Sequence, residues 1–265
     1  MKLKTSVALG MMILAAFCVF LLQSETAEGA LVAHWKLDEG SGNAIKDSSG
    51  EGHDGVFANG EPKWVNGVSG GALEFDGDDH VKIDAWITET GAADFSIAAW
   101  VKTSATGVAF LTKNNDDRVL DFHEKLFYIS DAGTSAGELT GAAEWVGHSC
   151  DWIRGSATNV ADGDWRHVAV TWKMDGLEGH IYVDGEEGVQ HMGYNGGADV
   201  EGDTWKIGFT SGWGGGVDYV GVVDDIRIYD ETLEVDEIVS IVAERGGAAV
   251  APSDKLAVKW GMLKK

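Results

Sequence analysis

Four aspartates stand where predicted strands end or turns begin, and carboxylate oxygens in such positions can hold a hard cation. The candidates are Asp38, Asp47, Asp76 and Asp224. Asp38 follows the predicted strand Leu31–Leu37, and Asp224 lies near the start of the predicted strand Val222–Tyr229. Ca²⁺ prefers about six to eight oxygen ligands. If these two strands pair antiparallel, we expect a structural Ca²⁺ site that clips the ends of the domain together.

The same aspartates have an ordinary structural interpretation. Asp47 lies in an Asp-Ser-Ser-Gly turn and Asp76 precedes Gly77, so either side chain could simply bond its own turn backbone. Asp224 could be satisfied by backbone groups or by Arg227. The sequence leaves the cation site and the turn interpretation both open.

A second group of residues could bind sugars. Aromatic side chains in irregular segments can stack on the apolar face of a sugar ring, while nearby amide and carboxylate groups bond its hydroxyls. The candidate ligand-binding residues are Trp145, Trp152, Trp213, Asn115 and Asp117. The alternative is that each of these tryptophans covers one end of the fold.

Catalysis is the third possibility. Sugar hydrolysis needs two carboxylates at a defined separation, and Asp199, Glu201 and Asp203 would share one face of an extended segment just before Trp205. Gly202 weakens a strand there, so we expect a hairpin loop with solvated acids instead. His167 alternates with apolar residues in a predicted strand, and we expect a structural role for it rather than that of a general base.

These residues are positioned by an all-β framework. Asn-Gly and Asp-Gly turn pairs recur between short runs of alternating apolar residues, a pattern typical of antiparallel sheets. The predicted strands are Leu31–Leu37, Ala72–Phe75, His80–Ile83, Phe95–Thr103, Val108–Lys113, Lys125–Ser130, Trp165–Lys173, Gly179–Val183, Thr204–Phe209 and Val222–Tyr229. One short helix is predicted over Leu233–Glu244, and Gly246 ends it. Five strand tryptophans are expected to pack inside: Trp35, Trp100, Trp165, Trp172 and Trp205.

Composition and charge limit the possible partners, the location and the domain organisation of the chain. The formal net charge is −23, which disfavours nucleic acid and anionic lipid as partners. Residues 1–27 read as a secretory signal peptide with cleavage between 27 and 30, although an uncleaved anchor is the alternative. We expect one domain over 31–245 and a basic tail over 246–265. After cleavage Cys150 is the remaining cysteine, so no internal disulfide is expected.

Seven segments in order resemble the laminin G-like domains of the concanavalin A-like lectin/glucanase superfamily. They are HWKLDEGSG (His34–Gly42), KDSSGEGHDG (Lys46–Gly55), GGALEFDGDDHV (Gly70–Val81), FSIAAWV (Phe95–Val101), DWRHVAVTW (Asp164–Trp172), IYVDGE (Ile181–Glu186) and VDDIRIYDETL (Val223–Leu233). The resemblance implies a jelly-roll sandwich of two antiparallel sheets. It also implies binding of glycans or proteins, often with calcium, although some relatives cleave polysaccharides.

The prediction for function is therefore a secreted, monomeric, non-catalytic binding module. An extracellular glycan is the leading ligand and a structural Ca²⁺ the expected cofactor. Adhesion to a cell-surface protein is the first alternative, and a glycosidase or lyase is the second.

Overall fold

The computed structural model describes residues 30–115, 124–131, 140–147, 151–154, 158–188, 191–192, 199–200, 202–209 and 218–246. The chain separates into the units Met1–Ala30 and Leu31–Lys265, and the description concerns the second. The predicted signal peptide, and the predicted tail beyond Gly246, lie outside the described residues. Within the described ranges, no helix has the length and apolar character needed to span a membrane.

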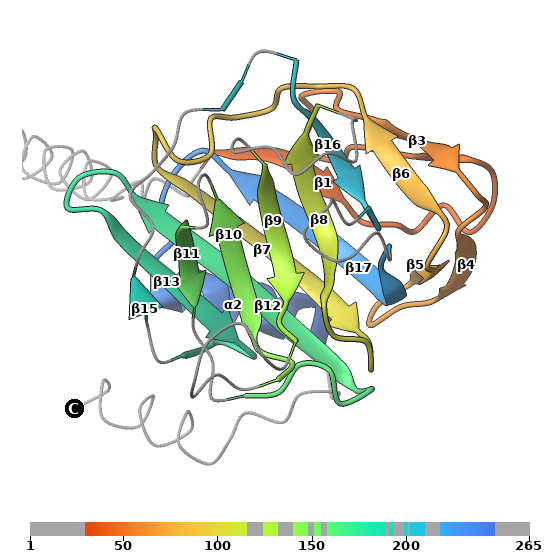
Figure 1. Cartoon of the computed structure of the whole chain (residues 1–265). Coiled ribbons are helices and arrows are strands. Elements are labelled where there is room, and N and C mark those ends of the chain that lie inside the picture. Colours follow the sequence, from red (N-terminus) through yellow and green to blue (C-terminus); the bar gives the residue numbers. More distant parts are fainter. Residues whose placement is uncertain are drawn as a thin grey trace, which may run out of the picture. The chain divides into compact units, whose positions relative to one another are not determined.

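The domain is a sandwich of two antiparallel sheets, as the sequence predicts (Figure 1). The eight-stranded sheet runs in the order β14 (Glu186–Glu187), β13 (Glu178–Val183), β12 (Trp165–Lys173), β7 (Phe95–Lys102), β17 (Val220–Tyr229), β5 (Gly71–Asp76) and β4 (Lys63–Asn66), with β1 (Leu31–Trp35) also paired to β17. The nine-stranded sheet runs in the order β15 (His191–Met192), β11 (Asp151–Arg154), β10 (Ala143–Gly147), β9 (Lys125–Ile129), β8 (Val108–Asn114), β16 (Thr204–Ile207), β6 (His80–Ile83), β3 (Gly55–Asn59) and β2 (Ala44–Ile45).

The first and last strands lie side by side, which confirms the pairing expected from the sequence. Leu31 is opposite Tyr229, and Trp35 is opposite Ile226. Strand β17 also pairs with β7 over Val222–Tyr229 and with β5 over Val220–Val223. A β-bulge interrupts the β17–β7 ladder between Asp224 and Arg227. The last strand therefore joins the N-terminal elements to the centre of the sheet.

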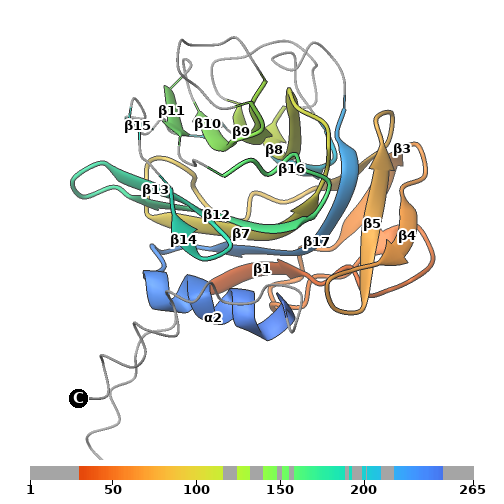
Figure 2. The ribbon, with the colours of Figure 1, turned by 90° about the horizontal axis from the view of Figure 1, so that it is seen from below.

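The core fills the space between the two sheets, because alternate residues of each strand point inward. Three of the five tryptophans predicted to pack inside belong to this core and are fully buried, namely Trp35, Trp172 and Trp205. Trp100 is also fully buried, but it lies outside this core cluster, against the ring of His167. Trp165, at the start of β12, is only partly buried. A second apolar layer covers the other face of the eight-stranded sheet, where Ile238 and Ile241 of helix α2 (Val235–Gly246) pack on Ala98 and Ala169 (Figure 2). The predicted helix is thus confirmed.

Candidate functional site

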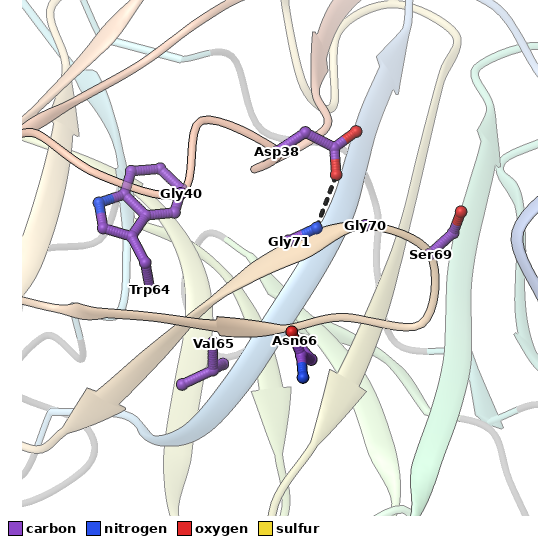
Figure 3. A pocket seen from close by; sticks show the side chains of 8 residues that line it. All are labelled: Asp38, Gly40, Trp64, Val65, Asn66, Ser69, Gly70 and Gly71. Atoms are coloured by element: carbon purple, nitrogen blue, oxygen red, sulfur yellow. Dashed lines mark hydrogen bonds between the residues drawn. The ribbon is translucent and has the colours of Figure 1, made fainter.

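An open cavity of about 510 Å³ lies where the loop after β1 meets the β4–β5 hairpin (Figure 3). Its wall combines one indole ring, one carboxylate, one amide, one hydroxyl, a valine and three glycines. The lining residues are Asp38, Gly40, Trp64, Val65, Asn66, Ser69, Gly70 and Gly71. An apolar surface with a few placed polar groups is typical of sites for small ligands.

Two aspartates fix the turn of this hairpin. Asp224 Oδ2 accepts a hydrogen bond from the Val68 amide at 2.8 Å, and Asp38 Oδ1 accepts one from the Gly71 amide at 2.8 Å. Gly70 has a φ of +82°, and a Cβ atom there would collide with the Asp38 carboxylate. Only glycine therefore allows the loop after β1 to approach the hairpin this closely.

Trp64 forms the aromatic wall of the cavity and is held from two sides. Its Nε1 donates to the carbonyl of Gly42 at 2.9 Å, and its ring lies 6.0 Å from the ring of Phe57. Figure 3 shows the indole beside Gly40, on the edge of the hollow. A half-buried indole with its N–H already bonded presents a preformed apolar surface, so little ordering is needed when a ligand binds.

The predicted Ca²⁺ site with four shared ligands does not form. Among the described residues, the group of three or more potential ligands close enough to share one ion is Asp76, Asp78 and Asp79. Asp38 and Asp224 instead hold the hairpin backbone. The four predicted ligands therefore do not form one group among the described residues, and Ca²⁺ binding itself stays a prediction.

Asp47 follows the turn interpretation. It accepts hydrogen bonds at 2.9 Å from the amides of His34, Ser49 and His53, and one from the Ser49 hydroxyl at 2.8 Å. Partial burial alone would raise the pKa of Asp47, but the backbone N–H groups outweigh it and the pKa is lowered. Its carboxylate is thus an acceptor that joins β1 to the following turn.

The Asp76–Asp79 turn gathers negative charge. A hydrogen bond to Asp76, together with repulsion by its charge, raises the pKa of Asp78. Burial raises the pKa of Asp79, whose Oδ1 accepts a bond from the Asp76 amide at 3.1 Å. Lys63 Nζ lies 3.4 Å from Asp76 Oδ2 and offsets part of this charge. Of the four predicted metal ligands, Asp76 is the member that belongs to this group.

The five residues predicted to bind sugar do not form one described site. Trp145 is fully buried and packs against Phe95 and Phe127, so that prediction is wrong: its ring faces the core from β10. Asn115 is exposed at the end of β8. Trp152 lies in β11, and its backbone pairs with Val146 of β10. Asp117 and Trp213 lie outside the described residues.

Asp199, one of the three acids considered for catalysis, is buried in an ion cluster instead of being solvated. Lys113 Nζ lies 2.5 Å from its Oδ2 and Lys125 Nζ lies 3.3 Å from its Oδ1, and all three side chains are fully buried. Burial lowers the pKa of Lys113, and the charge of Asp199 opposes that shift. The expectation of solvated acids is wrong for Asp199, and also for Asp203, which is buried and accepts the Val200 amide. Glu201 lies outside the described residues.

His167 is fully buried against the ring of Trp100, at 5.3 Å between centroids. Burial lowers its pKa to about 3; the charge of Asp225 opposes this shift and the charge of Arg227 adds to it. The imidazole is therefore neutral at ordinary pH and closed to solvent. These properties fit a packing role and exclude direct contact with a ligand on the surface.

The sequence analysis did not predict that Trp64, Asn66 and Ser69 would line one cavity. The Asn66-Gly67 turn pair was visible, but the short strand before it was not. The available signal was the position of Trp64, two residues before the Asn66-Gly67 turn pair. A side chain at that position lies beside the turn.

The comparisons with known proteins agree with this architecture. The family model of the concanavalin A-like lectin/glucanases superfamily matches residues 75–239, more than half of the chain. The chain belongs to this family. The laminin G-like resemblance is thereby confirmed. The lining of the cavity, residues 38–71, precedes the matched range. A comparison with curated proteins finds no match.

Solved structures of other jelly-roll proteins resemble this member of the superfamily. Domain 4 of AbnA, a GH43 extracellular arabinanase from Geobacillus stearothermophilus, solved with arabinotriose, has a TM-score of 0.61 and 16% identity over 81% of this chain and 98% of that one. The binding domain of Paraclostridial Mosquitocidal Protein 1 has a TM-score of 0.60 and 13% identity, over 81% of this chain and 52% of that one. Trypanosoma rangeli sialidase with the inhibitor DANA has a TM-score of 0.50 and 15% identity, over 80% of this chain and 32% of that one. At sequence identities this low, the similarity to these structures establishes the fold alone.

Proposed function

We propose that this chain is a non-catalytic module that binds carbohydrate in the cavity beside Trp64. The observation that carries the proposal is the composition of that cavity. The lining holds the Trp64 indole, the Asp38 carboxylate, the Asn66 amide and the Ser69 hydroxyl. In Figure 3 Asp38 lies between the indole and Ser69. Sugar rings offer an apolar face to the indole, and their hydroxyls can donate to and accept from the polar groups.

The relatives support a binding role. A structural neighbour from an arabinanase was solved with arabinotriose, and another is the binding domain of a mosquitocidal protein. Because the same fold serves enzymes as well, the site must decide between these roles. A glycan on the outside of the cell is the ligand class that these relatives favour.

The cavity argues against hydrolysis. Glycoside hydrolysis requires two carboxylates flanking the bond, whereas Asp38 is the one acidic residue in the lining. Asp199 is held by two buried lysines and cannot approach a substrate. We therefore favour binding without cleavage.

Affinity for a panel of neutral polysaccharides tests the proposal. Trp64→Ala should weaken binding by at least about tenfold, because it removes the stacking surface. Trp86→Ala is the matched control, since Trp86 is 39% exposed and lies outside the cavity lining. Equal binding by both variants and the wild type would place the glycan elsewhere. Binding to cell-surface protein, with no affinity for any polysaccharide, would favour the adhesion alternative.

Export and a monomeric state are further parts of the proposal. Residues 1–27 have the order of charged, apolar and polar segments that a secretory signal peptide has. N-terminal sequencing of the protein recovered from the growth medium tests this proposal, with a new first residue between 28 and 31 as the expected result. Size-exclusion chromatography of that product tests the monomer.

For Ca²⁺, the donor set that fits is the Asp76–Asp79 turn. Asp76 and Asp78 are exposed carboxylates, and Asp79 adds a third oxygen donor within reach. Such hard oxygen donors suit Ca²⁺. Its role would be to offset the repulsion that raises the pKa of Asp78.

A further inference from the structure

We infer that the Trp64 cavity selects its glycan by charge, favouring amino sugars over neutral sugars and excluding uronic or sulfated sugars. This inference rests on the proposed function and adds the ligand class. Asp38 is the one ionisable residue among the eight that line the cavity, and the lining contains no lysine, arginine or histidine. All eight residues belong to the described part of the chain.

The placement of Asp38 makes its charge part of the site. Its Oδ1 accepts the Gly71 amide at 2.8 Å, so the carboxylate is fixed against the hairpin instead of swinging into solvent. An ionised carboxylate only accepts hydrogen bonds, and each of its oxygens can accept more than one. A sugar hydroxyl can supply such a donor, and a protonated amine supplies a charge-assisted one.

An anionic sugar would find no favourable partner for its charge in this cavity. Its carboxylate or sulfate would enter a cavity that offers no cation to pair with it. Lys63, the basic residue next to Trp64, has its Nζ 3.4 Å from Asp76 instead. The net charge of −23 adds a repulsive field over the whole surface. At contact distances near a protein surface, like charges weaken binding by about tenfold or more.

The test is an array with neutral, amino and uronic oligosaccharides of matched length. Binding of the wild type, Asp38→Asn and Asp175→Asn is measured at low and high salt. Asn keeps a carbonyl oxygen that can accept the Gly71 amide, so the hairpin is retained. Asp175 is exposed in the β12–β13 turn and loses the same unit of charge outside the cavity lining. Far-UV circular dichroism checks that both variants are folded.

The wild type should bind amino sugars tightest and uronic sugars at least about tenfold more weakly than neutral ones. Asp38→Asn should reduce the difference in affinity between neutral and uronic sugars severalfold, while Asp175→Asn should leave that difference unchanged. Uronic sugars bound as tightly as neutral ones by the wild type would overturn the inference alone. The same effect from both variants would also overturn it, because the net charge would then explain the selectivity. Binding to none of the three sets would overturn the proposed function itself, and the inference with it.

Discussion

Asp38 and Asp224 hold the two ends of one hairpin turn: Asp224 accepts the Val68 amide and Asp38 accepts the Gly71 amide, each at 2.8 Å. One aspartate follows the first strand and the other lies in the last. The aspartates predicted to clip the domain through a cation therefore do so through backbone hydrogen bonds. The same arrangement shapes the cavity beside Trp64.

Replacing Asp224 should destabilise the domain. Asp224→Ala removes a buried hydrogen-bond acceptor and leaves the Val68 amide without its partner, so we expect a loss of about 2 kcal/mol in the free energy of unfolding. Urea unfolding measures this loss. The exposed Asp175→Ala is the control and should change stability by less than about 0.5 kcal/mol. Equal effects in the two variants would contradict the assigned role of Asp224.

The two tryptophans Trp145 and Trp64 should separate stability from binding. Trp145→Ala empties a fully buried position and should cost about 3–5 kcal/mol. Trp64→Ala affects a half-buried ring and should cost roughly 1–2 kcal/mol. Thermal unfolding and glycan affinity are measured on the same samples. Loss of affinity in a folded Trp145→Ala variant, with Trp64→Ala unaffected, would reverse the assignment.

His167 should contribute to acid sensitivity. Its pKa is about 3 in the folded chain against 6.5 in the unfolded chain, so the unfolded state takes up the proton first. The contribution of His167 is present above about pH 6.5 and is lost as the pH falls toward 3, by at most about 1.4 kcal/mol per pH unit.

His167→Phe keeps a ring against Trp100 and cannot titrate. Its stability should therefore depend less on pH in this window than that of the wild type, as measured by urea unfolding at several pH values. His180→Phe, at a partly exposed position, is the control. Parallel curves for the wild type and His167→Phe would show that His167 does not titrate in this way.

The buried ion cluster makes a prediction about Asp199. Asp199→Asn leaves Lys113 and Lys125 buried without their shared carboxylate, so we expect a loss of about 3–5 kcal/mol. Thermal unfolding reads this loss. Asp199→Asn combined with Lys113→Met should recover part of it, because one unpaired charge is removed. A variant as stable as the wild type would show that this cluster contributes little.

Calcium should act through the Asp76–Asp79 turn. Saturating Ca²⁺ should raise the melting temperature by several degrees over a chelated sample. Asp78→Asn should remove most of this rise, and Asp47→Asn should leave it in place, because Asp47 already bonds its own turn. An unchanged melting temperature in the wild type would contradict a Ca²⁺ site.

The sequence was sufficient for the framework because apolar side chains alternate along several strands. The alternation of Ser96–Val101 and His167–Trp172 identified β7 and β12, and these two strands pair with each other. The Asp184-Gly185 turn joins β13 to β14, with both residues at positive φ. Ile238 and Ile241, three residues apart on the predicted helix, lie on the face of α2 that packs on the sheet.

The site could not be predicted in the same way, because it depends on contacts between distant segments. β4 has only four residues between turn signals, which are too few to show the alternation of a strand. The sequence therefore did not place Trp64 in a strand. Glu144–Gly147 was read as irregular although β10 lies inside the sheet, which misplaced Trp145. Asp199 was expected to be solvated, because the sequence around it does not indicate that two lysines from other strands enclose its side chain.

The most direct test of the account is an NMR titration of the indole N–H signals with the tightest-binding oligosaccharide of the panel. Trp64 Nε1 donates to Gly42 beside the cavity, so its signal should report a ligand stacked there. We predict that the Trp64 indole and the Asn66 amide shift together, in proportion to saturation, while the Trp86 indole stays in place. Saturable binding that leaves the Trp64 and Asn66 signals unmoved would contradict the proposed site.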